Sequence, residues 1–163
     1  MSPTPTARTV VAIRHAHAGG SGAAGGPADH ERELDKRGRR EAAAAGRWLA
    51  EQGLAFDLVL VSDAARTRQT WSLIADQLPD SPEPTFEARI YNCDLDELVD
   101  LLVEDRGRVP VVAVVGHNPA VSELVWFLAG HDGPGLVPGA VAVVEAGTDA
   151  GISPGHIAGG FSP

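Results

Sequence analysis

The sequence predicts an α/β fold, a three-layer α/β/α sandwich with a mainly parallel central sheet. Apolar runs at residues 8–14, 57–62 and 109–115 have the length and the Val, Ile and Leu content of buried strands. Segments with apolar side chains three or four positions apart, the spacing of amphipathic helices, follow these runs. Strands that alternate with helices along a chain form a mainly parallel sheet with helices on both faces.

The first expected strand, residues 8–14, is followed by a segment rich in Gly, Ala and Ser at residues 18–28. This composition indicates a mobile loop, which we expect at the edge of the functional site. A long helix is expected over residues 35–52, with Gly53 suited to its C-cap. Its basic residues are expected to form a solvated face, and they are Lys36, Arg37, Arg39 and Arg40.

The second expected strand, residues 57–62, leads into a helix that Ser62 or Asp63 caps and that Pro79 ends. Residues 85–90 are expected to form a short third strand or extended segment.

Asp94 and Glu97 have the spacing of a capping box and predict the start of a third helix. The near-continuous apolar run at residues 109–115 is typical of a central strand that is covered on both faces. Asn118 is a good N-cap and Pro119 suits the first helical position, so a fourth helix is expected directly afterwards.

We expect residues 1–163 to form a single domain, since this length suits one hydrophobic core. A final or edge strand is expected at residues 139–145. The Gly- and Pro-rich tail, about residues 147–163, predicts at most one short strand, and residues 1–7 and this tail are expected to be flexible or peripheral.

The formal net charge of −9 argues against nucleic-acid and membrane partners, because both need a basic surface. Cys93 is the one cysteine of the chain, so an internal disulfide is excluded and a reducing compartment is favoured. No apolar run approaches the length that spans a bilayer. We therefore expect a soluble cytoplasmic protein.

Polar side chains follow three of the expected strands at the point where each strand ends. Arg14 and His15 follow the first, Ser62 follows the second with Arg66 one turn into the next helix, and His117 follows the run at 109–115. The carboxyl ends of parallel strands meet at one edge of a sheet, so we expect these side chains to lie together.

Two arginines, two histidines and a helix N-terminus make a pocket that suits a phosphoryl group. The pocket can serve for binding alone, or His15 can attack phosphorus as a neutral imidazole without a metal or other cofactor. His117 would then stabilise charge on the equatorial oxygens. Glu87 is the best-placed carboxyl group to protonate a leaving alkoxide, with Asp63 and Glu31 as alternatives.

Four segments resemble motifs of the histidine phosphatase superfamily, in the family's order and across residues 8–146. Residues 14–17 are similar to its Arg-His-Gly or Arg-His-Ala signature, and residues 34–42 to its Leu-Thr-x-x-Gly-x-x-Gln-Ala helix start. Residues 62–70 resemble its Ser-Pro-x-x-Arg-Ala-x-Gln-Thr segment, and residues 115–119 its Gly-His-Asn-Pro segment. The short chain looks most like the SixA-type phosphohistidine phosphatases.

The resemblance implies a phosphoglycerate mutase-like sandwich and a metal-independent phosphatase that forms a phosphohistidine intermediate on His15. Glu87 is the acid that it implies. The residues expected to bind the phosphoryl group are Arg14, Arg66, His117, Ser62 and Asn118. The chain departs from the family at Asp63, where proline is usual, and a carboxylate at the rim would oppose anion binding.

Three functions stay open. The partner is a phosphorylated, phosphohistidine-bearing signalling protein if the pocket is shallow and open, or a small phosphate ester if residues 18–30 form a lid. A non-catalytic phosphate-binding module is the third. A metal pair at His15 and His17 would need further ligands, for which only Asp29 and His30 lie near, so no metal is expected.

Overall fold

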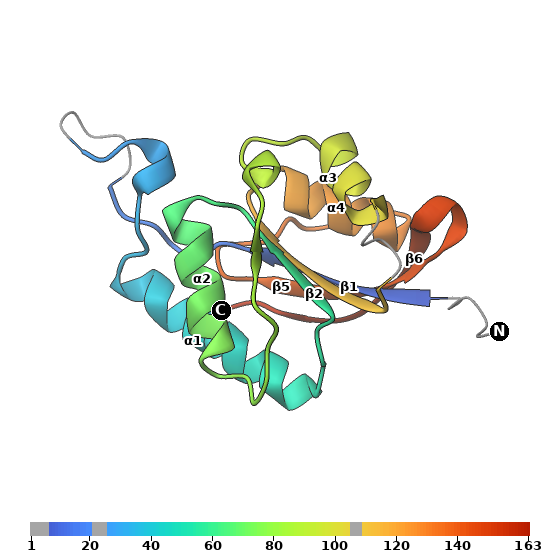
Figure 1. Cartoon of the computed structure of the whole chain (residues 1–163), viewed down its shortest axis with the longest axis horizontal. Helices are drawn as coiled ribbons and strands as arrows, with labels where there is room; N and C mark the ends of the chain where they lie inside the picture. Colours follow the sequence, from blue (N-terminus) through green and yellow to red (C-terminus); the bar gives the residue numbers. More distant parts are fainter. Residues whose placement is uncertain (1–6, 21–25, 105–108) are drawn as a thin grey trace.

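The computed structural model describes residues 7–20, 26–104 and 109–163, which form one mixed sheet between two layers of helices (Figure 1). The sheet has six strands in the order β3-β2-β4-β1-β5-β6. The strands are β1 (Ala7–Arg14), β2 (Leu58–Val61), β3 (Thr85–Phe86), β4 (Val111–Gly116), β5 (Val141–Gly147) and β6 (Ser153–Phe161). Strands β3, β2, β4 and β1 are mutually parallel, whereas β5 runs antiparallel to both of its neighbours.

The helices pack in two pairs, one on each face of the sheet. Helices α1 and α2 cover one face, and α3 and α4 cover the other (Figure 1). The helices are α1 (Lys36–Gln52), α2 (Ala65–Ala75), α3 (Leu95–Val103) and α4 (Ala120–Ala129), and the short 3-10 turns are η1 (Asp29–Glu31), η2 (Ala88–Ile90) and η4 (Asp149–Gly151). The predicted α/β/α sandwich with a mainly parallel sheet is thus confirmed.

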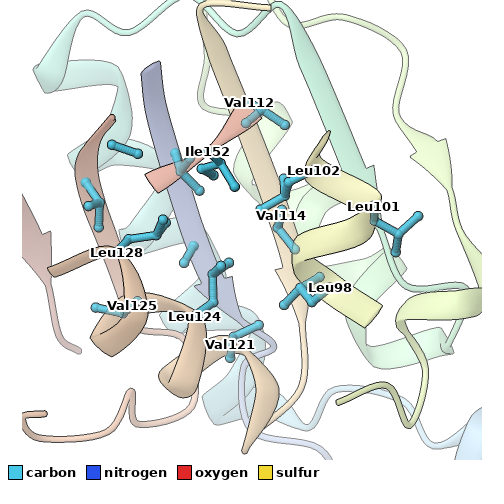
Figure 2. Close-up of a cluster of buried hydrophobic side chains, with 14 of the residues drawn as sticks. Leu98, Leu101, Leu102, Val112, Val114, Val121, Leu124, Val125, Leu128 and Ile152 are labelled. Carbon is cyan, nitrogen blue, oxygen red and sulfur yellow. The ribbon is translucent and has the colours of Figure 1, made fainter. Parts of the chain in front are cut away.

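Alternate residues of β1 enter two separate hydrophobic clusters. Val10 and Ala12 pack with α3 and α4, in the cluster that Figure 2 shows around Leu124 and Val114. The intervening residue Val11 packs with α1 and α2 on the opposite face. Since side chains of a strand alternate between faces, a strand covered on both sides must be apolar throughout. This explains the continuous apolar runs that predict β1, β2 and β4.

The ends of α1 and α3 follow local rules and confirm their predictions. The carboxylate of Asp35 accepts a hydrogen bond from the Gly38 N–H at 2.8 Å, and Gly53 ends the helix in the left-handed region with φ of 68°. Asp94 and Glu97 form the reciprocal hydrogen bonds of a capping box, both at 2.9 Å.

Helix α2 differs from its prediction at both ends. The residue before its first turn is Ala64, and neither Ser62 nor Asp63 caps it, because the Ser62 hydroxyl contacts a histidine and the Asp63 carboxylate contacts another. The helix ends at Ala75, four residues before Pro79. Tertiary contacts at the site thus take the side chains that local rules assign to the cap.

Two further elements have bounds other than those expected. The third strand comprises only Thr85–Phe86, and the chain turns into η2 immediately afterwards. Helix α4 starts after Pro119, which is itself the N-cap residue, so the expected cap by Asn118 is wrong. The Asn118 side chain instead accepts a hydrogen bond from the Ser122 hydroxyl at 2.7 Å.

The C-terminal segment forms the strands β5 and β6, and two expectations about this segment are wrong. Strand β5 is not at the edge, because it pairs with β1 on one side and with β6 on the other. Strand β6 runs over nine residues, although Gly and Pro are poor strand formers. It is an edge strand with two register shifts, where such residues are tolerated, and its Phe161 ring stacks on Trp48 of α1 at 6.1 Å.

Gly38 allows α1 to approach the segment that follows β1. A Cβ atom at this position would lie 2.0 Å from the carbonyl oxygen of His17. We expect Gly38→Ala to lower the free energy of unfolding by about 3 kcal/mol, near the upper range for overpacking, despite the helix propensity of alanine. Urea unfolding checks this, with Gly133→Ala as the control, since a Cβ there would meet its nearest atom at 3.9 Å. Equal stability of the two variants would contradict the prediction.

Candidate active site

The two histidines that follow β1 and β4 lie at the switch point of the sheet. Strands β1 and β4 are parallel neighbours, with Arg14 paired to Gly116. Helix α1 leaves β1 toward one face and α4 leaves β4 toward the other. In open α/β sheets, ligands bind at the carboxyl ends of strands that diverge in this way. The rings of His15 and His117 meet there, with centroids 5.3 Å apart.

The His15 ring is oriented by the main chain. Its Nδ1 atom lies 2.8 Å from the carbonyl oxygen of Ala16. A carbonyl oxygen only accepts hydrogen bonds, so we assign the ring proton to Nδ1. The neutral imidazole then carries its lone pair on Nε2. Nε2 is therefore the atom of His15 that is suited to nucleophilic attack.

Both rings are held in the neutral form by their surroundings. Burial lowers the pKa of His15 from 6.5 to about 4, and the nearby cations Arg66 and Arg14 act in the same direction. Burial likewise lowers the pKa of His117 to about 3, with the charges of His15 and Arg66 adding to the effect. His15 is thus a neutral imidazole at pH 7.

His117 has one ring nitrogen bonded and the other without a protein partner. Its Nε2 lies 2.8 Å from the hydroxyl oxygen of Ser62, at the end of the neighbouring strand β2. Within the described ranges, His117 Nδ1 and Arg14 Nε are buried polar atoms with no hydrogen-bond partner. Buried polar atoms are normally satisfied, and a bound anion would satisfy both.

A loop that follows α4 supports Arg14 from the side. The Leu136 carbonyl accepts hydrogen bonds from an Arg14 terminal nitrogen and from the Asn118 amide nitrogen, both at 3.0 Å. The main-chain N–H of Leu136 donates to the Ser122 hydroxyl at 2.9 Å. The described contacts of Asn118 thus hold the loop that supports Arg14.

The Arg66 guanidinium reaches from the first turn of α2 to η1. One terminal nitrogen donates to the main-chain oxygen of Asp29 at 2.7 Å, and the other donates to its carboxylate at 3.1 Å. Tyr91 also donates its hydroxyl to this carboxylate, and its ring lies edge-on to His117 at 5.5 Å. The sequence predicts neither the contact of Asp29 with Arg66 nor that of Tyr91 with Asp29. The one signal available was that Asp29 is a carboxylate near the predicted site.

Only part of the expected loop at residues 18–28 can be placed. Residues 21–25 lie outside the described residues, and the expectation of a lid rests partly on them. The base of the segment is closed by a bridge between Ala18 and Leu34 and by a hydrogen bond from the Gly19 N–H to the Glu33 oxygen at 3.0 Å. Its C-terminal flank is η1, which is fixed to α2 through Arg66.

The proposed acid Glu87 lies one strand away from Ser62, since its N–H donates to the Val61 oxygen at 2.8 Å. Its carboxylate accepts hydrogen bonds from the Arg89 guanidinium at 2.9 and 3.0 Å. Arg89 also pairs with Glu104, and these two carboxylates raise the pKa of Arg89. The ion pair competes with a role of Glu87 in proton transfer.

The other two candidates for the acid occupy the rim. The carboxylate of Asp63 lies 2.8 Å from Nε2 of His30, which makes it part of an ion pair when His30 is protonated. Glu31 is exposed on η1. The identity of the proton donor therefore stays a prediction.

The contacts of His17 are those of a structural residue rather than those of a metal ligand. Its Nδ1 lies 2.6 Å from the carboxylate of Glu41, which is only 7% exposed and also pairs with Arg37. In the parts of the chain that the structure describes, no three His, Cys, Asp or Glu side chains gather as a set of metal ligands.

Two further features concern the protonation state of Cys93 and the length and apolar character of the helices. Burial, reinforced by Glu97, raises the pKa of Cys93 to about 11, so its thiol stays protonated at neutral pH. None of the helices in the described ranges combines the length and apolar character that a bilayer-spanning segment needs.

The lowered pKa of His15 predicts how turnover depends on pH. If His15 is the nucleophile, protonation of Nε2 blocks its attack, and activity is lost below the pKa of this ring. We expect kcat/KM to stay level from pH 7 to about pH 5 and to fall toward pH 4. His15 and His117 are in contact, so the measured value belongs to the pair.

A pH profile with two substrates of different ionisation checks this expectation, because an enzyme group gives the same acid limb with both. Circular dichroism at each pH shows that the protein is still folded. An acid limb near pH 6.5, the ordinary value for histidine, would contradict the prediction.

Comparison with known proteins agrees with this geometry. The chain is 38% identical over 108 residues to an uncharacterized protein of Mycobacterium tuberculosis (strain H37Rv), and this match spans 66% of each chain. A structure assigned to a phosphohistidine phosphatase SixA from Nakamurella multipartitia is 29% identical, with a TM-score of 0.81 over 99% of both chains. The protein histidine phosphatase SixA in complex with tungstate is 26% identical, with a TM-score of 0.80 over 95% of this chain and 97% of that one.

The sequence model of the histidine phosphatase superfamily (branch 1) matches residues 10–110. This segment contains Arg14, His15 and Arg66, whereas His117 follows it and lies beside His15 through the pairing of β1 with β4. The family match covers more than half of the chain, and the fold is the phosphoglycerate mutase-like fold of this family. The chain belongs to the histidine phosphatase superfamily (branch 1).

Proposed function

We propose that the protein is a metal-independent phosphatase that carries the phosphoryl group on Nε2 of His15. The observation that carries this proposal is the hydrogen bond between His15 Nδ1 and the Ala16 oxygen at 2.8 Å. It leaves a neutral Nε2 lone pair beside His117, in a pocket that Arg14 and Arg66 make positive. This set of groups suits in-line phosphoryl transfer.

The reaction proceeds in two displacements. In the first, the Nε2 lone pair forms a bond to phosphorus, and the bond between phosphorus and the leaving group breaks with its electron pair on the leaving group, which takes up a proton. In the second, a water molecule attacks phosphorus, gives up a proton and releases phosphate as the bond to Nε2 breaks. Arg14 and Arg66 neutralise the charge on the phosphoryl oxygens during both steps, and the neutral His117 ring stabilises these oxygens by donating a hydrogen bond.

We propose phosphohistidine on a signalling protein as the substrate and the cytoplasm as the compartment. A leaving imidazole is far less basic than an alkoxide and depends less on an acid. The carboxylates of Glu87 and Asp63 are engaged by Arg89 and His30, which fits a reaction with little need for an acid. Of the similar solved structures, one is described as a phosphohistidine phosphatase SixA and another as the protein histidine phosphatase SixA.

A small phosphate ester is the second candidate substrate. The observation in its favour is the contact of η1 with Arg66, which brings a wall to one side of the pocket. In this case Glu87 becomes the acid to test, since an alkoxide leaving group needs a proton.

Phosphate release, measured with a chelator present, tests the proposal. The substrates are a phosphohistidine-bearing protein and a panel of small phosphate esters. Release confined to the phosphoprotein supports the signalling function, and release mainly from esters supports the second candidate. No release from either leaves the phosphate-binding module, which phosphate titration by calorimetry would then detect.

A further inference from the structure

We propose that Asp29 is a positioning residue that holds Arg66 in the orientation required for phosphoryl binding. This inference rests on the proposed function, because it concerns the arginine of the same pocket. Asp29 lies 37 residues before Arg66 in the sequence. It belongs to η1, at the C-terminal flank of the Gly-rich loop.

Asp29 bonds to one edge of the Arg66 guanidinium and does not use the N–H donors on its other edges. Both terminal nitrogens of Arg66 donate to it, at 2.7 Å to its main-chain oxygen and at 3.1 Å to its carboxylate. A guanidinium has five N–H donors in a fixed plane, so three of them are not used in these two bonds. Two bonds on one edge fix the plane and determine where the other donors point.

The Arg66 side chain also needs an anionic partner because it is only 8% exposed. A buried cation without a partner is costly, and the carboxylate of Asp29 neutralises it before any substrate is bound. The cation is therefore held in place and does not have to be ordered when the phosphoryl group arrives. Preorganised charge of this kind lowers the barrier of the transfer step.

Asp29 is itself held by two further donors. The Tyr91 hydroxyl donates to one carboxylate oxygen and Arg32 donates to the other at 3.0 Å. The hydrogen bond from Tyr91, helped by Arg32 and Arg66, holds the pKa of Asp29 well below its usual range. Asp29 is thus a permanent anion, which suits a positioning role and not that of a proton donor.

The segment around Asp29 is fixed at a second point. His30, the next residue, lies 2.8 Å from the Asp63 carboxylate at the start of α2 and edge-on to the Tyr91 ring at 4.9 Å. The Arg32 side chain also donates to the Gly19 oxygen at 3.0 Å. These contacts tie η1 to the base of its loop and to the helix that carries Arg66.

A rival interpretation predicts the opposite change in phosphate affinity when the charge of Asp29 is removed. If the carboxylate of Asp29 competes with the phosphoryl group for Arg66, then removing its charge should tighten phosphate binding. If Asp29 positions Arg66, the same change should weaken binding and slow turnover. The isosteric variant Asp29→Asn separates the two, because it removes the charge and keeps the size of the side chain.

The experiment compares Asp29→Asn, Asp29→Glu and Tyr91→Phe with wild type. For Asp29→Asn we expect kcat/KM on the phosphohistidine protein to fall about tenfold to a hundredfold, the effect of a misplaced binding group. The Kd of inorganic phosphate, measured by calorimetry, should rise. Tyr91→Phe should give a smaller loss of the same sign, and Asp29→Glu should restore part of the loss.

The pair Asp29→Asn and Tyr91→Phe should be less than additive, because Tyr91 acts through the Asp29 carboxylate. Asp132→Asn, on an exposed loop, is the control and should leave both readouts unchanged. An unchanged or tighter phosphate Kd in Asp29→Asn overturns the inference. A loss of activity that is fully accounted for by a lower Tm also overturns the inference, because it would indicate a structural role.

The failure of the proposed function is distinguishable from the failure of this inference. A wild-type protein that binds phosphate but releases none from any substrate would refute the phosphatase, and the phosphate Kd of Asp29→Asn would still decide the role of Asp29. A wild-type protein that neither turns over nor binds phosphate would refute both.

Discussion

Replacing His15 with alanine is expected to lower phosphate release by a factor of about 10⁴ or more, the scale found when a covalent nucleophile is removed. The reason is chemical, because the variant removes the neutral ring nitrogen that attacks phosphorus. His15 Nδ1 is bonded to the Ala16 oxygen, which directs the lone pair of Nε2 to the pocket. His117, the neighbouring ring, is bonded through its own Nε2 to Ser62.

The loss is measured as phosphate release and as labelling of the protein by radioactive phosphoryl substrate. Wild type should form an acid-labile phosphoprotein, and His15→Ala should form none. His156→Ala is the matched control, since this histidine is exposed on β6, and it should behave as wild type. Equal labelling of His15→Ala and wild type would place the nucleophile elsewhere.

His117→Ala is expected to reduce kcat by about 10² to 10³, the usual cost of removing one preorganised donor from a charge-stabilising site. His117 lies 5.3 Å from the His15 ring by centroids, and its Nδ1 is a buried atom without a partner among the described residues. A phosphoryl oxygen that accepts from this ring would supply that partner. The variant keeps the nucleophile, so the phosphoprotein should still form, only slowly.

Rapid-quench kinetics separates the two steps and checks this expectation. Ser62→Ala is the companion variant, and it should lose less activity, because Ser62 acts by orienting the His117 ring through their contact at 2.8 Å. Circular dichroism confirms that both variants fold. A change of less than threefold in kcat of His117→Ala would remove this histidine from the mechanism.

Predictions that depend on local chemistry agree with the structure where no distant group competes for the same side chain. The Asp35 cap, the Gly53 terminus and the capping box of Asp94 with Glu97 each involve residues within one helical turn. Such contacts are available in any context where the helix forms, so local sequence is sufficient for them. The alternation of strands with helices also required no knowledge of distant contacts.

Predictions fail where a distant contact competes with a local one. Ser62 is a good cap by its position, but its hydroxyl contacts His117, 55 residues later. Asp63 contacts His30, and the Asn118 amide nitrogen donates to the Leu136 oxygen, 18 residues later. In each case the side chain gains a partner that only the folded chain brings within reach.

The Gly- and Pro-rich segment of β6 shows the same competition for the backbone. Its composition disfavours a strand, yet the free edge of β5 offers a row of hydrogen-bonding groups that it pairs with. Phe161 then packs on Trp48, far away in the sequence. The composition of β6 does not predict this pairing, because the pairing depends on the edge of a different strand, β5.

The sequence alone determined the layer architecture, the positions along the chain of the buried strands β1, β2 and β4, and the placement of Arg14, His15, Ser62 and His117 at strand ends. It did so because hydrophobic period and helix capping are local properties of the chain. Tertiary structure alone decided the tautomer and neutral state of His15, the loop that supports Arg14, and the contacts of Asp29 with Arg66 and Tyr91. These depend on burial and on groups brought together from 37 and 62 residues apart, which no local pattern encodes.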